Sequence, residues 1–220
     1  MLTKIMSLIT KFIFSLIEKR LKKAYSSKFS VHGANPKSVF WKNEFTQDLR
    51  LELIINTLQN SYNLQHTSFL DIGCGYGRLL QKMSEHNLLR NSKYYGIDIN
   101  EDFINFCKGQ YILKNVNFYN KSVLPFNVDF TIMSGTYNLC TLNNLSIWEE
   151  YVCQSLSKNW GKTNVAMIFN LLVKNEKVIK DRLYYTNKSW IKRFCEQNLG
   201  FTSITKNKLL PNDIMIFVQR

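Results

Sequence analysis

The stretch SFLDIGCGYGRLL, from Ser68 to Leu80, decides how this chain folds. It begins as a short apolar strand and passes through three glycines, Gly73, Gly75 and Gly77, into the start of a helix. Glycine loses more conformational freedom on folding than other residues, roughly 0.5–1 kcal/mol relative to alanine in regular structure. A chain keeps such residues where its backbone turns tightly or approaches a ligand closely. The stretch therefore predicts a ligand-binding loop beside the acidic residue Asp71.

Strand-like and helical patterns alternate along the chain around this loop. Runs typical of strands cover residues 68–73, 94–99, 116–119, 129–135, 165–170, 201–210 and 213–220. Helical patterns cover residues 45–59, 77–89, 100–113, 146–159 and 187–199, and Asn100 is expected to cap the third of them. Strands separated by helices predict a doubly wound, mostly parallel α/β sheet with helices on both faces. The turn at residues 211–213 is too short for a crossover, so one of the last two strands is expected to run antiparallel.

Length and composition are those of one ordinary globular domain. The 220 residues are 45% hydrophobic and 20% charged, enough to bury a single core. The five cysteines form an odd set without a CxxC pair, which argues against a metal site or a disulfide framework and favours a reducing, cytoplasmic compartment. The net charge of +13 indicates either a generally lysine-rich surface or an anionic partner. It leaves an acidic substrate, nucleic acid and a membrane surface open.

The first 25 residues form a pattern of their own. Apolar side chains recur there at helical spacing, at Ile5, Leu8, Ile9, Phe12, Ile13, Leu16, Ile17 and Leu21, with basic residues filling much of the rest. The apolar run is far shorter than the ~20 residues of a membrane-spanning helix, and no small-residue cleavage site follows it. We predict a basic amphipathic helix over residues 1–25, which either packs on the domain or lies peripherally on an anionic membrane or a partner protein. The remaining domain is predicted over residues 26–220, with 26–62 as a cap over its ligand site.

The glycine loop separates two classes of ligand. A dinucleotide loop after the first strand of such a sheet has the pattern G-x-G-x-x-G. Here the third glycine comes one position early, Arg78 stands where that pattern requires glycine, and Asp71 would put a negative charge beside a pyrophosphate. A cationic ligand without phosphates suits the loop better, and S-adenosylmethionine carries an ammonium and a sulfonium. Asp98, which follows Gly77 by 21 residues at the end of the second strand, is placed to accept hydrogen bonds from ribose hydroxyls.

Residues 40–220 resemble the class I S-adenosylmethionine-dependent methyltransferases. LDIGCGYG (70–77) is similar to their first motif and YYGIDIN (94–100) to their second. NKSVLPFNVDFTIMSG (120–135) is similar to the segment that carries the adenine contact and the fourth strand. The resemblance implies a Rossmann-like, seven-stranded sheet with its last strand antiparallel. It also implies methyl transfer that leaves S-adenosylhomocysteine as the product.

The resemblance further implies a set of cofactor-binding residues. They are Asp71, Gly73, Cys74, Gly75, Gly77, Asp98, Ile99, Ser122, Ser134 and Gly135. The glycine backbone would approach the methionine and ribose portions, Asp71 would organise the ammonium end, and Asp98 would hold the ribose. Ser134 and Gly135 would offer backbone oxygen near the methionine part. The family often has an acid shortly before the LPF segment, whereas this chain has Asn-Lys-Ser, so Ser122 or neighbouring backbone is expected in its place.

Two shorter segments, residues 25–50 and 134–139, are similar to parts of small bacterial methyltransferases of polysaccharide or small-metabolite pathways. That similarity implies that Trp41, Gln47 and Arg50 lie near the pocket, and Gln47 and Arg50 share a helix face. Arg50 would then clamp the cofactor carboxylate or an anionic substrate in bidentate fashion. The alternatives are a solvated helix face for Gln47 and Arg50 and ordinary packing for Trp41.

Methyl transfer requires few catalytic groups from the protein, because the sulfonium already activates the methyl group. Collinear positioning of the methyl group and the acceptor supplies most of the rate. Tyr137 and Asn138, just past the fourth strand, are expected to face the cofactor and the acceptor. His32 is the histidine best placed to act as a base for a hydroxyl acceptor, with Tyr137 as its rival.

The sequence also argues against several methyl acceptors. SGTYN after the fourth strand lacks the Asn/Asp-Pro-Pro-aromatic motif of amide- and adenine-nitrogen methylases. Cys140 follows leucine, unlike the proline-linked cysteine of cytosine-5 enzymes, and the clustered acids of metal-dependent catechol-type enzymes are missing. The favoured hypothesis is an O-methyltransferase acting on a small molecule or sugar, anionic or phosphorylated ones included. The alternative is an RNA-directed methyltransferase, or a non-catalytic cofactor-binding module, that uses the basic surface.

Overall fold

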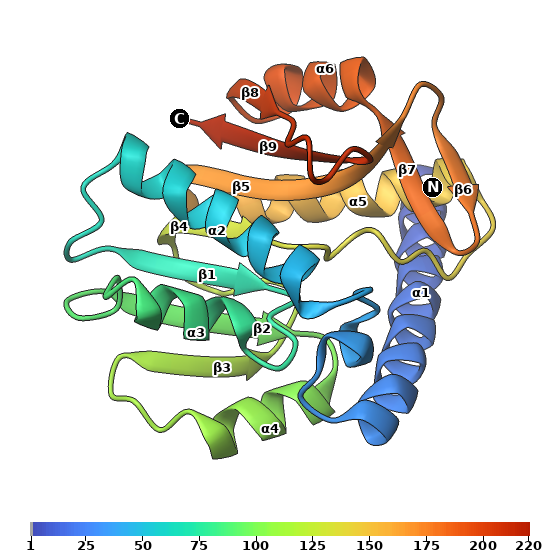
Figure 1. The fold of residues 1–220 in the computed structure, drawn as a ribbon. Coiled ribbons are helices and arrows are strands. Elements are labelled where there is room, and N and C mark those ends of the chain that lie inside the picture. Colours follow the sequence, from blue (N-terminus) through green and yellow to red (C-terminus); the bar gives the residue numbers. More distant parts are fainter. Residues whose placement is uncertain (1) are drawn as a thin grey trace.

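Helices and strands alternate along most of the chain. The computed structural model describes residues 2–220, with side chains described from Leu8 onward. Its helices are α1 (Leu2–His32), the short 3-10 helix η1 (Pro36–Val39), α2 (Glu44–Ser61), α3 (Arg78–Glu85), α4 (Glu101–Gln110), α5 (Leu145–Trp160) and α6 (Lys188–Asn198). Its strands are β1 (Ser68–Ile72), β2 (Lys93–Asp98), β3 (Val116–Asn120), β4 (Val128–Met133), β5 (Thr163–Lys174), β6 (Val178–Lys180), β7 (Leu183–Asn187), β8 (Phe201–Thr205) and β9 (Asp213–Gln219). Over the described residues these strands form one nine-stranded sheet with helices on both faces (Figure 1).

The sheet confirms the predicted doubly wound fold. Strands β3, β2, β1, β4 and β5 lie side by side in that order and are parallel. As predicted, one of the last two strands is antiparallel: β9 pairs with β5 in the antiparallel direction, and β8 pairs with β9. The predicted strand over residues 201–210 ends early, at Thr205. The reason is a turn at Asn207, whose side-chain oxygen accepts a hydrogen bond from the backbone N–H of Leu209.

The sequence does not predict the hairpin of β6 and β7. β7 pairs parallel with the last residues of β5, where Leu172 lies between Tyr185 of β7 and Asp213 of β9. β7 therefore occupies the edge of β5 that β4 leaves free. The hairpin turns at Asp181 and Arg182, with φ of 52° and 62°. Two-residue turns of this kind are normally marked by Asn-Gly or Asp-Gly, so the usual sequence signal is missing.

Each face of the sheet buries a separate apolar core. One core lies under α2 and α3 and includes Leu51, Ile55 and Leu80. The other lies under α1, α5 and α6 and includes the fully buried Trp148. Figure 1 shows α2 and α3 in front of the sheet and α5 behind it. Burying one such side chain stabilises the fold by roughly 1.5–3 kcal/mol, so both layers are fixed against the strands whose carboxyl ends carry the loops.

Helix α1 stands across the carboxyl ends of β1, β2 and β3, at the right of Figure 1. Ile17 and Leu21 on one of its faces are buried in the core that also contains α5 and α6. The predicted apolar residue Ile5 lies outside the described side chains. Within the part of the chain that the structure describes, we find no helix with the length and apolarity to cross a membrane.

The helix continues past its predicted end at residue 25 and stops at His32. Tertiary packing explains the extension, because Phe29 contacts Phe103 of α4 with ring centroids 4.8 Å apart. Gly33, with φ of +58°, follows the last residue and permits the chain to turn away. Residues 26–32 of the predicted cap therefore belong to α1, and the rest of the cap consists of η1 and α2 with their loops.

Candidate active site

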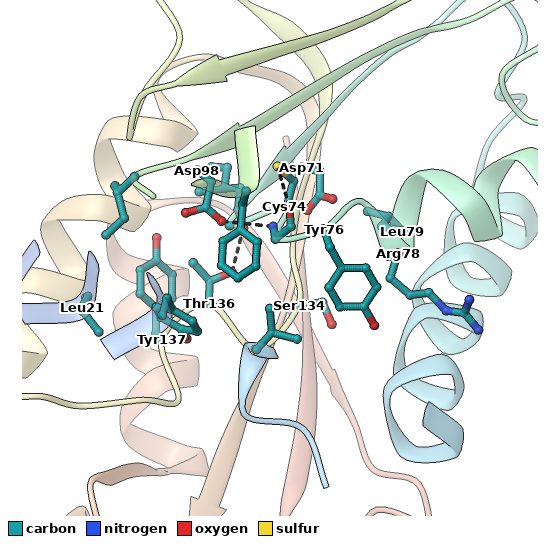
Figure 2. A pocket seen from close by; sticks show the side chains of 18 of the residues that line it. Leu21, Asp71, Cys74, Tyr76, Arg78, Leu79, Asp98, Ser134, Thr136 and Tyr137 are labelled. Carbon is teal, nitrogen blue, oxygen red and sulfur yellow. Dashed lines mark hydrogen bonds between the residues drawn. The ribbon is translucent and has the colours of Figure 1, made fainter. Parts of the chain in front are cut away.

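A cavity opens at the carboxyl ends of β1, β2 and β4, between the glycine loop, α1 and the segment before β1. This first cavity encloses about 980 Å³, counting the part that opens to solvent. Figure 2 shows Asp98, Tyr137 and Leu21 on one side of it and Tyr76 and Leu79 on the other. The predicted residues in its lining are Trp41, Gln47, Asp71, Gly73, Cys74, Gly75, Asp98, Ile99, Ser122, Ser134, Gly135 and Tyr137. The structure thus brings most of the predicted cofactor residues to one place.

The loop after β1 has a conformation that requires glycine. Gly73, Gly75 and Gly77 have φ of 74°, 52° and 87°, in the region that favours glycine. Gly77 is the N-cap residue before α3 and lies outside the cavity lining, and a Cβ added there would lie 2.6 Å from the ring of Tyr111. Burial raises the pKa of the Cys74 thiol well above its ordinary value, so this side chain is a neutral packing group.

Asp98 ends β2 with its carboxylate turned toward this loop. Its two oxygens accept hydrogen bonds from the backbone N–H groups of Gly75, at 3.1 Å, and Asn100, at 2.8 Å. Asn100 caps α4, as predicted, by accepting from the N–H of Asp102. Burial raises the pKa of Asp98 to about 6, although the two backbone N–H groups and the charge of Lys22 lower it. The carboxylate is held in place and keeps lone pairs for donors from a ligand.

Asp71, in β1, is the second buried carboxylate of the cavity. One of its oxygens accepts a hydrogen bond from the hydroxyl of Tyr94 at 2.6 Å. Burial raises the pKa of Asp71 to about 7; the Tyr94 hydrogen bond lowers it and the charge of Asp98 raises it. Among the described residues neither carboxylate takes part in a salt bridge. An opposite charge within ~4–6 Å favours the ionised form, so this pair favours a cationic ligand.

The loop after β4 closes another side of the cavity. The N–H of Gly135 donates to Oδ1 of Asn170 in β5 at 2.7 Å, and the Thr136 hydroxyl donates to the carbonyl of Ile72 at 2.7 Å. The hydroxyl of Ser134 is buried and has no hydrogen-bond partner among the described residues. Leaving such a group unpaired is unfavourable by about 1–3 kcal/mol, so a polar ligand group beside it would stabilise the site.

The structure places the two predicted catalytic bases differently. His32 ends α1 and does not line the cavity between the glycine loop and α1. Tyr137 does line the first cavity, but its hydroxyl is hydrogen-bonded to that of Ser155 at 2.7 Å. Burial raises the pKa of Tyr137 to about 12, so the phenol is neutral near pH 7 and is a poor proton acceptor.

Arg50 lies outside the first cavity, in contacts within the protein. Arg50 does not line the first cavity; its Nε donates to Asp213 at 2.8 Å and its Nη1 to the carbonyl of Thr46 at 2.6 Å. The guanidinium also stacks on Trp41, 4.4 Å from the ring centroid. Nε and Nη1 of Arg50 are therefore engaged within the protein, and the side chain lies away from the cavity where a cofactor carboxylate was expected.

These contacts form part of a closed ring. The carboxylate of Asp213 also accepts from Nδ2 of Asn170 at 3.1 Å, and Asn170 accepts from the N–H of Gly135. Trp41 closes the ring, because a Cβ on Gly135 would overlap with its indole. We call Trp41, Arg50, Gly135, Asn170 and Asp213 the cap ring. It ties the segment before β1 to β5, β9 and the loop after β4.

A second cavity adjoins the first and encloses about 1100 Å³, again counting the part open to solvent. Four residues line both cavities: Tyr25, Val39, Trp41 and Gly135. Its other apolar lining residues are Phe40, Leu139, Leu172, Leu183, Tyr185, Leu209, Leu210 and Pro211. Its polar ones are Lys42, Thr46, Arg50, Asn138, Asn212 and Asp213. The predicted residue Asn138 therefore lies here, where its side-chain oxygen accepts from the N–H of Leu172 at 3.2 Å.

Several lining residues of the first cavity carry no signal in the sequence. Leu21 and Tyr25 come from α1, and their spacing indicates only an amphipathic stripe. Tyr76 lies in the glycine loop and donates its hydroxyl proton to Gln47 at 2.6 Å. Tyr151 comes from the middle of α5. Their place at the cavity depends on how distant elements pack, which helical periodicity does not show.

Residues 63–199 match the family model of the methyltransferase domain. This span is more than half of the chain, and the chain belongs to that family. S-Adenosylmethionine is accordingly the cofactor of this domain, and its activity is S-adenosylmethionine-dependent methyl transfer. No curated protein matches the chain by sequence.

Solved structures share the fold at low sequence identity. A methyltransferase from Leishmania major has a TM-score of 0.66 and 12% identity, covering 94% of this chain and 82% of its own. Magnesium protoporphyrin IX methyltransferase from Synechocystis PCC 6803, solved with bound S-adenosylhomocysteine, has a TM-score of 0.59 and 16% identity, covering 78% of this chain and 82% of its own. The CurJ carbon methyltransferase has a TM-score of 0.59 and 13% identity, covering 99% of this chain and 70% of its own. At these identities the likeness is one of fold.

Proposed function

We propose that this domain transfers a methyl group from S-adenosylmethionine to an oxygen atom of a small molecule bound in the second cavity. The observation that supports this most is the common wall of the two cavities, formed by Tyr25, Val39, Trp41 and Gly135. A ligand in one cavity and a ligand in the other would meet at these residues. Such contact is what an in-line displacement requires, because holding the reactants together and aligned supplies much of the rate.

The residues of the first cavity fit the polar groups of the cofactor. Asp71 would hold the ammonium group, Asp98 would accept from the ribose hydroxyls, and the unpaired hydroxyl of Ser134 would gain a partner. Ile99 and Ser122 line the same cavity and would contact the adenine end. When bound, S-adenosylmethionine supplies a methyl group that its positive sulfonium already activates.

The lining of the second cavity favours an acceptor with an apolar body. Most of its side chains are aliphatic or aromatic, and the charge of Arg50 is already paired with Asp213. Among the described lining residues Lys42 is the remaining cation, so one anionic group on the acceptor could be met there. A compound with many phosphates or hydroxyls would leave most of its polar groups without partners. We therefore favour an aromatic or aliphatic hydroxyl compound over a phosphorylated sugar.

The described lining of the second cavity holds no free base for this acceptor. Asp213 is the one carboxylate among the described residues that line the second cavity, and it is hydrogen-bonded to Arg50 and Asn170. The rate would then come from positioning and from the acceptor's own acidity, which favours a hydroxyl more acidic than that of an alcohol, such as a phenol or enol.

A screen of methyl transfer tests the proposal. Labelled S-adenosylmethionine is offered with hydroxylated aromatics, nucleotide sugars, phosphorylated metabolites and RNA. We expect turnover with the first group, abolished by Leu183→Trp, which fills the second cavity from β7, with S-adenosylhomocysteine affinity unchanged in calorimetry. Leu113→Trp, at an exposed position after α4, is the matched control and should retain turnover.

Other outcomes favour the alternatives. Transfer to RNA that Leu183→Trp leaves intact would favour an RNA-directed enzyme that uses the basic surface, consistent with the net charge of +13. Cofactor binding without transfer to any class would favour a non-catalytic binding module. Full turnover of a small acceptor by Leu183→Trp would place the acceptor outside the second cavity.

A further inference from the structure

The outward face of α1 carries a row of exposed apolar side chains. Leu8, Ile9, Phe12 and Leu16 are between 41% and 66% exposed. Positions 8, 12 and 16 are four residues apart and lie on one face of the helix, with residue 9 beside them. The opposite face is buried, as Ile17 shows. We call Leu8, Ile9, Phe12 and Leu16 the apolar patch.

Basic side chains continue the same face toward the end of α1. Lys19 follows Leu16 by three residues and Lys23 follows Lys19 by four, and both lysines are exposed. Exposed basic residues also flank this row; they are Lys11, Arg20 and Lys22. Over residues 2–32 the chain has seven lysines and arginines and one acid, Glu18. Glu18 is half-buried, and burial raises its pKa, so it offsets little of this charge on the outward face.

We propose that this face docks the protein on the surface of an anionic lipid membrane. A helix with an exposed apolar row and lysines at its margin lies in the interface plane, with the apolar side chains at the boundary of headgroups and acyl chains. The lysines then face acidic headgroups, which attract basic residues within a Debye length of the surface. The combination of an apolar patch and a single sign of charge is what selects this occupant.

A second copy of the chain is a poorer occupant for the same reason. Parallel pairing of two α1 faces would bring Lys19 and Lys23 of both copies together, and antiparallel pairing would set these lysines against the apolar patch of the other copy, in a protein of net charge +13. Like charges at an interface oppose association. An anionic surface relieves this repulsion instead of adding to it.

Docking would also bring the two cavities close to the membrane surface. The buried side of α1 contributes Leu21 and Tyr25 to the first cavity, and Tyr25 also lines the second. The helix that faces the membrane is thus a wall of the site. If the proposed function holds, an apolar acceptor dissolved in the membrane would be presented near this wall; the docking itself does not rest on that function.

Co-sedimentation with vesicles tests the docking in the full chain. Vesicles of phosphatidylglycerol and phosphatidylcholine are compared with vesicles of phosphatidylcholine alone. We expect at least tenfold stronger binding to the anionic vesicles, weakened by salt. Leu8→Ser/Phe12→Ser and Lys19→Glu/Lys23→Glu should each lower that binding at least tenfold.

Matched controls come from exposed positions elsewhere. Val31→Ser changes an apolar side chain that is 73% exposed at the other end of α1. Lys206→Glu/Lys208→Glu reverses two exposed charges in the loop between β8 and β9. Both controls should bind anionic vesicles within twofold of the unmodified chain, and all variants should bind S-adenosylhomocysteine unchanged, which separates docking from the proposed function.

Three results would overturn the docking. One is absence of binding to anionic vesicles. Another is that Lys206→Glu/Lys208→Glu weakens vesicle binding as much as Lys19→Glu/Lys23→Glu does, which would show that binding depends only on the overall charge. The third is a dimer in analytical ultracentrifugation that Leu8→Ser/Phe12→Ser dissociates while vesicle binding persists, which would assign the patch to a second copy.

Discussion

Replacing Arg50 by methionine should destabilise the protein by about 3–5 kcal/mol, the range for a buried ion pair that loses one partner. The side chains of Arg50 and Asp213 are 11% and 6% exposed, and Nε lies 2.8 Å from Oδ2. In Arg50→Met the Asp213 carboxylate keeps only the hydrogen bonds from Asn170. The buried carboxylate then lacks its counter-charge, and this accounts for the expected size of the loss in unfolding free energy. Loss of the stacking on Trp41 adds to it in the same direction.

A double mutant separates the buried charge from lost packing. Arg50→Met/Asp213→Asn leaves neither charge in the ring, and neutral replacements of a whole buried pair are often close to neutral in stability. The double mutant should therefore be more stable than Arg50→Met alone. Urea unfolding at pH 7 measures the free energies, with Arg90→Met, at an exposed position after α3, as the control expected within about 0.5 kcal/mol of the parent.

Lowering the pH should reduce the loss of unfolding free energy in the Arg50→Met variant. Burial raises the pKa of Asp213 above its ordinary value of 3.8, and Arg50 is the main group that opposes this rise. Without Arg50 the folded-state pKa is higher still, so the ionised form is the destabilised one and protonation removes the penalty. The loss of unfolding free energy in Arg50→Met should therefore become smaller as the pH falls from 7 toward the pKa of this carboxyl in the unfolded chain. A deficit under about 1 kcal/mol at pH 7, typical of a surface ion pair, would refute the cap ring as a structural unit.

Three further predictions concern the first cavity and the glycine loop beside it. Asp98→Ala should weaken S-adenosylhomocysteine binding by about 1.5–3 kcal/mol in calorimetry, the range for hydrogen bonds to a charged group, and unchanged affinity would remove Asp98 from the site. Because burial raises the pKa of Asp98 to about 6 and of Asp71 to about 7, and ligand donors favour the ionised forms, affinity should be level above pH 7 and fall as pH drops through 7 and 6. A flat calorimetric profile would contradict contact with either carboxylate. Gly77→Ala should lower the unfolding free energy by about 1–3 kcal/mol, because its φ is +87° and its Cβ would meet Tyr111. Gly109→Ala, in α4 with open space around it, is the control and should be neutral or stabilising by up to about 1 kcal/mol.

The cofactor side of the fold could be predicted because its signals are local. Gly73, Gly75 and Gly77 alternate with other residues, and each has a positive φ, which the residue type alone indicates. Asp98 lies at a strand end whose register with β1 follows from the parallel order of the sheet. Each of these inferences joins residues that are close in sequence or fixed by the topology.

The acceptor side depends on contacts that no local pattern shows. Arg50 and Asp213 are 163 positions apart, and the sequence of α2 gives no sign that its arginine pairs with the first residue of β9. The hairpin that brings Leu183 and Tyr185 to the second cavity turns at Asp181, without the glycine that normally marks such a turn. Arg50 was therefore expected to face a ligand, whereas in the packed structure it forms an ion pair that joins α2 to β9.

Helix α1 shows why two alternatives drawn from one amphipathic pattern need not exclude each other. A helix of 31 residues has more than one apolar row, and packing on the domain uses the row of Ile17 and Leu21. The row of Leu8 and Phe12 points the other way and stays exposed. Deleting the helix removes both rows at once, so an unfolded or aggregated fragment would be the expected result whether or not a membrane binds. Substitution at Phe12 alters one row alone, because a side chain that is 66% exposed contributes little to the core. Vesicle binding that fails in such a variant while the fold is retained can therefore be assigned to the outward face.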